Sequence, residues 1–238
     1  MFKPVIIIPF YNHINGFKKI VRKISTLNYP VIVIDDGSIP NEQKEAKQLC
    51  KKFNFTFLEN KTNMGKGYVV KKAMTFATQK GFSHALQIDA DGQHKIEDIK
   101  DFFALAQENP TSIINSHPIY DTSIPKARLY GRKITNFWTF IETGGKRIPD
   151  SMCGFRVYPL KEMKKILPLI HQNRMGFDIE ILIKSIILKI NIVNKKTPVI
   201  YPLDGVSHFK TLRDNWHITL THTKLCLFAI LNLIKRQK

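Results

Sequence analysis

Two carboxylates, Asp89 and Asp91, directly follow the apolar run 85–88, which has the composition of a buried β-strand. Strand ends in open α/β sheets are where ligands bind. Gly92 lets the chain turn, so that Asp89, Asp91 and the amide oxygen of Gln93 can share one cation. Such oxygen ligands suit Mg²⁺ or Mn²⁺, the ions that bridge diphosphates. Because an Asp-x-Asp pair is common by chance, the elements around it must support the site.

Strand and helix patterns alternate along the first 93 residues. We expect apolar strands at residues 5–9, 31–34, 55–58 and 85–88, and helices at residues 17–27, 42–53 and from 65–67 onward. This alternation predicts a parallel sheet with right-handed crossovers. Tyr11, the pair Asp35-Asp36 and the Asp89/Asp91 pair then follow strands whose ends share one edge, where these polar side chains converge.

Length and cysteine content fit a single α/β domain. The 238 residues, 43% of them hydrophobic, can bury a full core. Cys50, Cys153 and Cys226 lie far apart without C-x-x-C spacing, so neither a disulfide framework nor a thiolate zinc site is expected. We therefore expect a cytoplasmic protein. The apolar run near the N-terminus is too short for a signal peptide or a membrane span.

The chain is strongly basic, with 37 Lys and Arg against 19 Asp and Glu and a net charge of +18. Such a charge attracts polyanions, which include nucleic acid, anionic membrane surfaces and phosphorylated small molecules. The basic residues are scattered and no sequence signature of a nucleic-acid-binding fold occurs, so we expect no specific nucleic acid partner. A non-catalytic nucleotide-sugar- or RNA-binding module remains the alternative from a different class.

Four segments resemble, in order and spacing, the successive motifs of family 2 glycosyltransferases. They are IIPFYN, VIDDGS, NMGKG and QIDADGQ, at residues 7–12, 33–38, 63–67 and 87–93. The D-x-D-x-Q ending is similar to that of polyprenyl-phosphate sugar synthases. Residues 150–158 and 205–209 resemble the glycosyltransferases encoded with bacterial aryl-polyene lipid synthesis.

The resemblance implies a GT-A fold, a Rossmann-like, mostly parallel sheet flanked by helices, with a nucleotide-sugar donor and Mg²⁺ or Mn²⁺ as cofactor. We expect one GT-A domain at residues 1–212, with a nucleotide-sugar-binding half at 1–93 and an acceptor half at 94–212. An amphipathic helix is expected at residues 213–238.

The same resemblance implies the donor-binding residues. It assigns Pro9, Tyr11, Asp35 and Asp36 to the nucleobase and ribose, whose N–H and hydroxyl groups donate to carboxylates. A helix-capping turn is the structural alternative for the two acids. Further candidates for the nucleotide-sugar site are Asn63, Lys66, Gly67 and Asp89. The first three precede a helix whose free amides suit an anion, and the glycines allow close backbone approach.

The expected reaction is an inverting displacement at the anomeric carbon. Asp178 is the candidate general base, with Glu180 as second choice; a charge that stabilises a helix N-terminus is the alternative for Asp178. Arg156 is the second catalytic candidate because its planar guanidinium can pair with a phosphate, although a surface salt bridge is equally compatible. Arg128, Arg132 and His208 are candidates of the same kind as Arg156. His94 is expected at the rim of the site rather than on the metal.

The expected acceptor is a lipid or a lipid-linked molecule, with a polyprenyl phosphate as the alternative. The polyprenyl-phosphate branch usually carries R-x-x-G-x-S-K where this chain reads PLDGVSH at residues 202–208. The loss of that Arg and Lys favours a different lipid or a hydroxyl acceptor.

The C-terminal run 225–234 is almost continuously apolar and precedes a basic tail. Ten residues cannot span a bilayer, so we expect this segment to lie in the interface, as a peripheral contact with the inner face of the cytoplasmic membrane. A helix packed on the domain or in a dimer contact is the alternative. The apolar stretch 137–141 is expected in the core.

Overall fold

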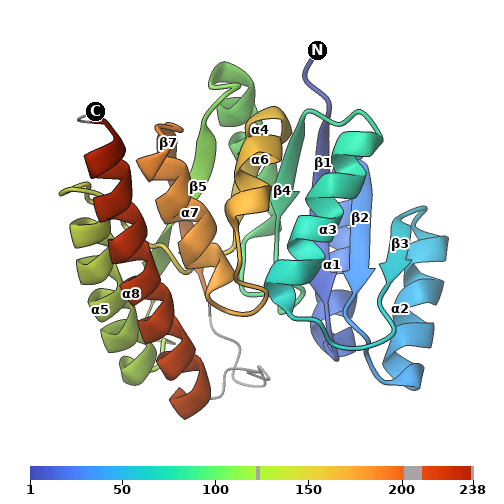
Figure 1. Ribbon diagram of the computed structural model, residues 1–238. Helices are drawn as coiled ribbons and strands as arrows, with labels where there is room; N and C mark the ends of the chain where they lie inside the picture. Colours follow the sequence, from blue (N-terminus) through green and yellow to red (C-terminus); the bar gives the residue numbers. More distant parts are fainter. Residues whose placement is uncertain (122–123, 201–210, 237–238) are drawn as a thin grey trace.

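The computed structural model describes the fold of residues 1–121, 124–200 and 211–236, which form a mixed sheet with helices on both faces (Figure 1). The sheet order is β3-β2-β1-β4-β6-β5-β7. Its strands are β1 (Pro4–Phe10), β2 (Val31–Asp35), β3 (Thr56–Glu59), β4 (His84–Gln87), β5 (Ile113–Tyr120), β6 (Arg156–Pro159) and β7 (Ile192–Val199). The helices are α1 (Ile14–Ser25), α2 (Pro40–Lys52), α3 (Lys66–Gln79), α4 (Ile99–Glu108), α5 (Lys126–Glu142), α6 (Leu160–Ile166), α7 (Phe177–Ile187) and α8 (Thr211–Arg236), with short 3₁₀ turns at Ile96–Asp98 and Leu167–Leu169.

The first four strands are parallel, as the alternating pattern predicts. β1 lies between β2 and β4, and β3 extends the sheet beyond β2. β6 runs antiparallel to both β4 and β5, and Gln87 at the end of β4 pairs with Arg156 at the start of β6. The carboxyl ends of β1 to β4 therefore share one edge with the amino end of β6. The expected mostly parallel α/β sheet is confirmed.

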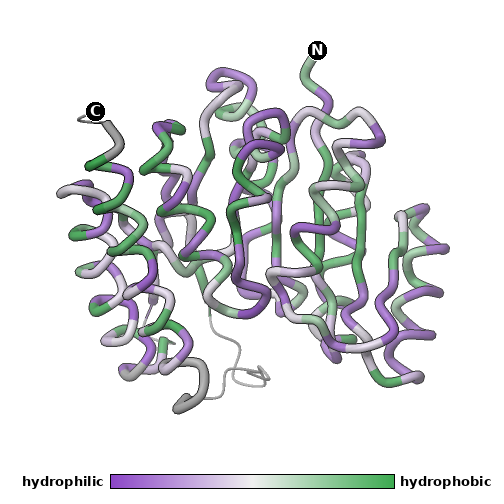
Figure 2. Tube along the Cα trace, in the orientation of Figure 1, coloured by the Kyte–Doolittle hydropathy of each residue, from purple (hydrophilic) through white to green (hydrophobic). Residues whose placement is uncertain are grey.

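The core lies on both faces of the sheet because alternate strand residues point to opposite sides. In β1, Ile6 and Ile8 pack with α1 and α4 on one face, whereas Val5 and Ile7 pack with α3, α6 and α7 on the other. Figure 2 shows hydrophobic residues along these central strands and a largely hydrophilic α2 at the edge.

The C-terminal helix forms as expected and packs on the domain through one stripe. Ile218 and Leu225 of α8 cluster with Ile179 and Ile183 of α7. On its other side α8 runs beside α5 (Figure 1).

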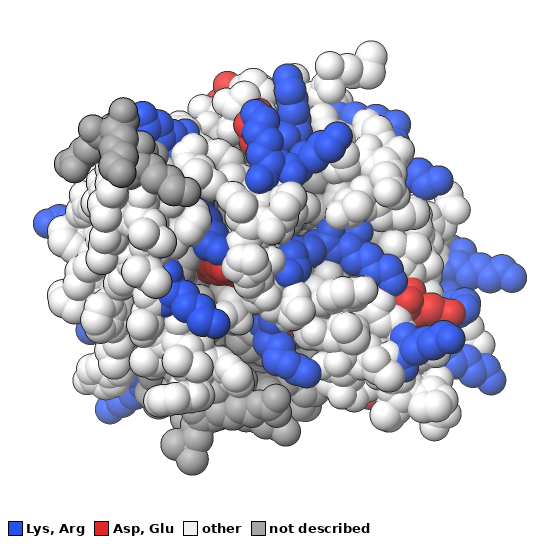
Figure 3. All heavy atoms as spheres, in the orientation of Figure 1, with Lys and Arg blue, Asp and Glu red and all other residues white. Residues whose placement is uncertain are grey.

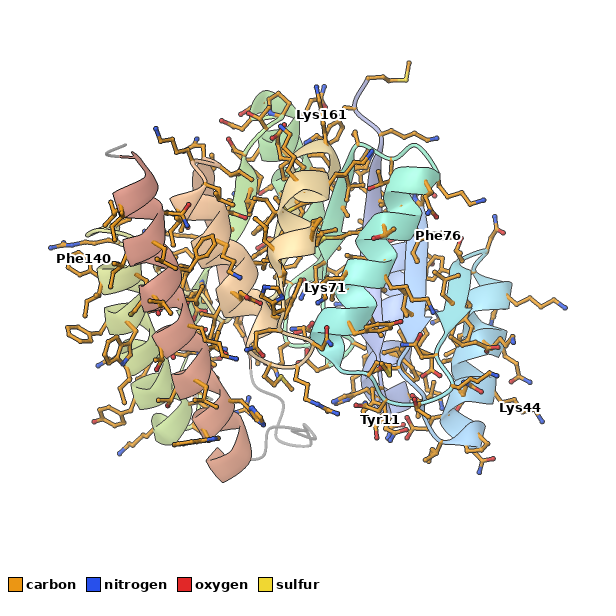
Figure 4. The ribbon with its side chains drawn as sticks, viewed as in Figure 1. Tyr11, Lys44, Lys71, Phe76, Phe140 and Lys161 are labelled. Carbon is orange, nitrogen blue, oxygen red and sulfur yellow. The ribbon has the colours of Figure 1, made fainter. Side chains whose placement is uncertain are left out.

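The prediction that the apolar stretch 137–141 is core was wrong. Phe137 is 60% exposed and Trp138, Phe140 and Ile141 are exposed as well, and Phe140 points outward from α5 in Figure 4. The buried residues of α5 are instead polar, namely Thr135, Thr139 and Glu142. An apolar run in the sequence can predict a helix, but it does not show which side of that helix packs against the rest of the protein.

Candidate active site

The Asp89–Asp91 turn lies at the carboxyl edge of the sheet, directly after β4. Gly92 has φ +75°, a conformation that few residues other than glycine adopt, and the backbone N–H of Gln93 donates to Asp91 Oδ1 at 3.0 Å. The expected turn is confirmed. Gln93 is partly exposed beside the two acids.

Helix α1 supports this turn from below at Gly16. A Cβ atom at position 16 would lie 2.4 Å from the carbonyl oxygen of Ala90, so only glycine lets the helix pack this closely. Sequence reasoning missed Gly16. Its signal was an isolated glycine inside a strongly amphipathic helix pattern, which often has a packing reason.

Lys66 brings two of the predicted acids together. Its Nζ lies 2.8 Å from Asp89 Oδ2 and 2.9 Å from Asp178 Oδ2. Gln87, the last residue of β4, donates from Nε2 to Asp178 Oδ1 at 3.1 Å. Side chains from β4, α3 and α7 thus form one network at the sheet edge. Gln87 was not anticipated, although a polar residue inside an apolar strand was a visible signal.

The charges in this network set the ionisation of its members. Burial alone lowers the pKa of Lys66, but the charges of Asp178 and Asp89 exceed that effect and hold its pKa above the ordinary value. Burial also acts on Asp89, yet the Lys66 ammonium keeps the pKa of that carboxyl below its usual range. For Asp91, burial and the charge of Asp89 both raise the pKa. Lys66 thus favours the ionised form of Asp89, and the charge of Asp89 in turn disfavours the ionised form of Asp91.

Gly154 closes the network from the β6 side. A Cβ atom there would lie 2.4 Å from Gln87 Nε2, 2.7 Å from Lys66 Nζ and 3.4 Å from Asp89 Oδ1. Any side chain at this position would push into the network. Gly154 was not a predicted site residue, because nothing in the local pattern places the strand after it beside β4.

Arg156 has a different place from the one expected. It is completely buried, and its guanidinium donates to Asn115 Oδ1, the Asp178 carbonyl and the Ser151 carbonyl. These bonds occupy the planar fork, which corrects both earlier interpretations of it as a phosphate ligand and as a surface salt bridge. Arg156 positions Asp178 by holding the first turn of α7.

Asp178 and Glu180 share the first turn of α7 but face different partners. Asp178 is 3% exposed and points at Lys66 and Gln87. Glu180 accepts from the backbone N–H groups of His171 and Gln172 and from Lys184, so it holds the segment before the helix rather than facing the network. Of the two candidate bases, only Asp178 joins the predicted site.

Asp35 and Asp36 are both buried at the end of β2. Asp35 accepts from the Ser38 backbone N–H and from Gln43 Nε2, but it does not cap α2, whose N-cap residue is Ile39 without a side-chain cap bond. Asp36 accepts from the backbone N–H groups of Met64 and Gly65 at 2.8 and 2.7 Å. These bonds tie the second strand end to the N-M-G-K-G segment and so help to place Lys66.

The neighbouring donor-site candidates lie at the same edge. Tyr11 lies just past the carboxyl end of β1, at the lower rim of the sheet in Figure 4, and Pro9 is the partly buried penultimate residue of that strand. Asn63 accepts a hydrogen bond from Arg174 at 3.2 Å. The structure therefore brings the predicted donor residues of the first 93 positions together.

The glycines of the N-M-G-K-G segment serve a different contact from the one expected. Cβ atoms at Gly65 and Gly67 would lie 2.2 Å from the Asn173 carbonyl oxygen and 2.5 Å from Phe177 Cβ. This close approach is made by Asn173 and by Phe177, the first residue of α7. It brings Lys66 to Asp178.

The remaining candidates are spread around the site. His94 stacks on Phe155 and lies 4.0 Å from Cys153 Sγ, behind the Asp89–Asp91 turn. Arg132 pairs with Asp150, whose other carboxylate oxygen accepts from the backbone of Met152 and Cys153, so this pair fixes the loop that carries Gly154. Arg128 is half-buried on α5. His208 lies outside the described residues.

The donor set of the turn fits a divalent cation that is shared with a phosphate ligand. Asp89 Oδ1 is buried and has no hydrogen-bond partner among the described residues, and Asp91 lies two residues further on in the same turn. In the described part of the chain, no three His, Cys, Asp or Glu side chains are grouped to hold a metal by themselves. Mg²⁺ is usually bound by one or two carboxylates together with substrate phosphates, which is what this edge offers.

Comparison with known sequences agrees with this site. The profile described as glycosyl transferase family 2 matches residues 5–166. A dolichyl-phosphate beta-glucosyltransferase of Dictyostelium discoideum is 31% identical over 173 residues, which make up 68% of this chain and 52% of that protein. A UDP-N-acetylglucosamine–dolichyl-phosphate N-acetylglucosaminyltransferase of Methanococcus voltae is 27% identical over 214 residues, 82% of this chain and 85% of that one. This chain thus spans about half the length of the first relative and most of the second.

Solved structures share the fold. Staphylococcus aureus TarS in complex with UDP-GlcNAc superposes with a TM-score of 0.65 at 16% identity, over 97% of this chain and 67% of that one. Glucosyl-3-phosphoglycerate synthase of Mycobacterium tuberculosis, solved with Mn²⁺ and UDP, gives 0.62 at 14% identity, over 94% and 80%. At such identities the likeness speaks for the GT-A fold alone. With the family profile covering most of the chain and the expected motifs gathered at one sheet edge, this protein belongs to glycosyl transferase family 2.

Proposed function

We propose that this chain is a metal-dependent, inverting glycosyltransferase that moves a sugar from a nucleotide sugar to a lipid-linked acceptor. The observation that carries the proposal is the Asp89–Asp91 turn, joined through Lys66 to Asp178 at the edge where Pro9, Tyr11, Asp35 and Asp36 also lie. Support comes from the family membership and from relatives named for nucleotide-sugar and dolichyl-phosphate substrates.

A polyprenyl phosphate is the acceptor class that we favour within this function. The relatives carry dolichyl phosphate in their names. An ionised phosphate needs no general base to attack the anomeric carbon, whereas a hydroxyl does. Both oxygens of Asp178 already accept hydrogen bonds, from Lys66 and Gln87, which suits a positioning role better than proton removal. The missing Arg and Lys at residues 202–208 argued for another lipid, and that segment lies outside the described residues.

Asp89 and Asp91 would hold Mg²⁺ or Mn²⁺, with Gln93 beside them. When bound, the cation neutralises charge that develops on the leaving diphosphate. The chain itself orients the donor through the buried carboxylates at the end of β2. Lys66 favours the ionised form of Asp89, and Gly154, which has no side chain, lets the segment before β6 pack against both groups.

The proposed location is the inner face of the cytoplasmic membrane. Residues Trp216–Ile234 of α8 are long and apolar enough to cross a membrane, which by itself is weak support because core helices pass the same test. The basic character of the chain suits an anionic membrane surface.

Donor turnover by the purified chain tests the function. We expect UDP- or GDP-sugar consumption that needs a divalent cation and a short polyprenyl phosphate and that stops on addition of a chelator. Asp91→Asn should abolish turnover without loss of folding. Asp101→Asn should leave turnover unchanged, because Asp101 is an exposed acid on α4 that pairs with Lys195. Full activity of Asp91→Asn would overturn the site. Salt-sensitive RNA binding without nucleotide-sugar binding would replace the enzyme with the binding-module alternative.

A further inference from the structure

Helix α5 is built with its polar side inward. Apart from Leu129, the buried and half-buried residues of α5 that the structure describes are polar and recur at helical spacing: Arg128, Arg132, Thr135, Asn136, Thr139 and Glu142. Its exposed residues include six large hydrophobic side chains, with Lys126 and Lys133 among them: Tyr130, Ile134, Phe137, Trp138, Phe140 and Ile141. A helix on a water-facing surface shows the opposite arrangement.

Helix α8 repeats this arrangement next to α5. Its buried positions include Thr221 and His222 as well as Ile218 and Leu225. Its exposed positions again include large apolar side chains, beside a few polar ones near the start of the helix: Trp216, Leu220, Leu227, Ile230, Leu231, Leu233 and Ile234. The surface over α8, at the left of Figure 3, is mostly uncharged, whereas Lys and Arg gather over the centre of the molecule.

A buried polar contact fixes the two helices to each other. His222 Nδ1 lies 2.8 Å from Glu142 Oε1, and the ring of Trp138 lies over that of His222. Glu142 and His222 are each at most 4% exposed. The exposed apolar residues of α5 and α8 therefore belong to one rigid surface, which we call the α5–α8 face.

Positive charge accompanies the α5–α8 face. Residues 126–142 and 216–234 include the exposed Lys126, Lys133 and Lys224, and their one acid, Glu142, is buried. An apolar area with a basic flank is complementary to anionic lipid, in which acyl chains lie beneath negative head groups. Two copies of the face would instead bring like charges together.

We propose that the α5–α8 face is a lipid-binding surface that lies in the interface of an anionic membrane. The apolar side chains of both helices enter the acyl region while the inward polar residues stay in the protein. α8 does not cross the bilayer in this arrangement, because Ile218 and Leu225 stay packed on α7 and His222 stays bonded to Glu142. This goes beyond a C-terminal anchor, since α5 supplies half of the surface.

The α5–α8 face is joined to the proposed active site by a short path of contacts. Arg132 of α5 pairs with Asp150, and Asp150 holds the backbone of Cys153 at 2.8 Å. The next residue, Gly154, lies against Lys66 and Asp89. This inference rests on the proposed function in one respect: it takes the acceptor to be a membrane lipid.

Vesicle co-sedimentation of the purified full chain tests the proposal. We expect binding to vesicles of phosphatidylcholine with phosphatidylglycerol, weaker binding to phosphatidylcholine alone, and loss of the difference at high salt. The double variant Phe137→Glu/Leu227→Glu, one exposed residue from each helix, should lower vesicle partitioning by about tenfold or more. Ile39→Glu is the matched control, since Ile39 is 54% exposed just before α2, at the opposite edge of the molecule from α5 and α8 (Figure 1), and should leave partitioning unchanged.

Three other outcomes would contradict the lipid-binding role of the α5–α8 face. Wild-type protein that stays in the supernatant with both vesicle types, or a double variant that binds as well as wild type, overturns the proposal. A wild-type dimer in lipid-free light scattering that the double variant turns into a monomer would assign the face to a second copy instead. Circular dichroism confirms that the variants are folded.

The vesicle result is separable from the proposed function. Turnover of a short, water-soluble polyprenyl phosphate does not need the membrane, so the double variant should keep it. Vesicle binding without turnover of any donor would leave the lipid-binding face standing and remove the enzyme proposal; turnover without vesicle binding would do the reverse.

Discussion

The ammonium of Lys66 lies 2.9 Å from a carboxylate oxygen of Asp178, which joins the first turn of α3 to the first turn of α7. Asp89 shares the same ammonium at 2.8 Å. The cluster at the sheet edge is thus held together by its own charges. Each of its parts comes from a different segment, so a change in one should be felt in the others.

Removing the charge of Lys66 should destabilise the fold as well as the site. Lys66→Met leaves two acids near each other without their cation, and breaking a largely buried ion pair costs about 3 kcal/mol or more. Urea denaturation measures this loss. Lys47→Met is the matched control, because the Lys47–Glu59 pair is exposed and should matter by less than about 1 kcal/mol. An equal effect of the two substitutions would contradict the role given to Lys66.

A methyl group at position 154 should damage the site directly. Gly154→Ala places Cβ 2.7 Å from Lys66 Nζ and 2.4 Å from Gln87 Nε2, so these groups must move. We expect turnover to fall by more than about tenfold with a lower melting temperature. Gly131→Ala serves as control, since nothing lies within 4 Å of its added Cβ and alanine should stabilise α5 by about 0.5–1 kcal/mol. A Gly154→Ala enzyme with wild-type kinetics would show that the contact is not tight.

Gly16→Ala should affect metal use more than donor binding. The added Cβ meets the carbonyl oxygen of Ala90 at 2.4 Å, so either α1 or the Asp89–Asp91 turn must shift. We expect the Mn²⁺ concentration for half-maximal turnover to rise severalfold, while the nucleotide affinity in the absence of metal changes little. Titration of activity against Mn²⁺ and calorimetry with UDP distinguish the two. Unchanged metal dependence would refute the supporting role of Gly16.

Stability should fall in mild acid because of His84. Burial lowers the pKa of His84, although its bond to the Pro110 carbonyl opposes this. The unfolded chain therefore takes up the proton first, below its ordinary pKa of about 6.5, and stability declines as the pH drops from there through the folded pKa. Thermal melts across this range should show a smaller decline for His84→Gln. Parallel declines of the two proteins would mean that other groups carry the effect.

Much of the site was predictable because it lies on elements that the local pattern reveals. Asp35, Asp36, Asp89 and Asp91 each follow an apolar strand, and parallel strands bring their ends to one edge. The motif spacing also led to Lys66 and Asp178, though as separate features.

What the sequence did not reveal depends on long-range pairing. Gly154 and Arg156 reach the site only because β6 enters the sheet antiparallel beside β4, which no local periodicity indicates. The buried state of Arg156 depends in turn on Asn115 in β5. The apolar stretch of α5 was assigned to the core for a related reason, since its orientation is set by polar partners on α8.

The reversed direction of β6 also separates positions that reach the site from positions that do not. Residues just before Arg156 sit at the ligand end of the sheet, whereas those just after Pro159 emerge about 13 Å away at the other end. Substitutions just upstream of this strand should therefore change turnover, whereas a substitution at the exposed Lys161, just downstream and far from Tyr11 in Figure 4, should leave turnover unchanged.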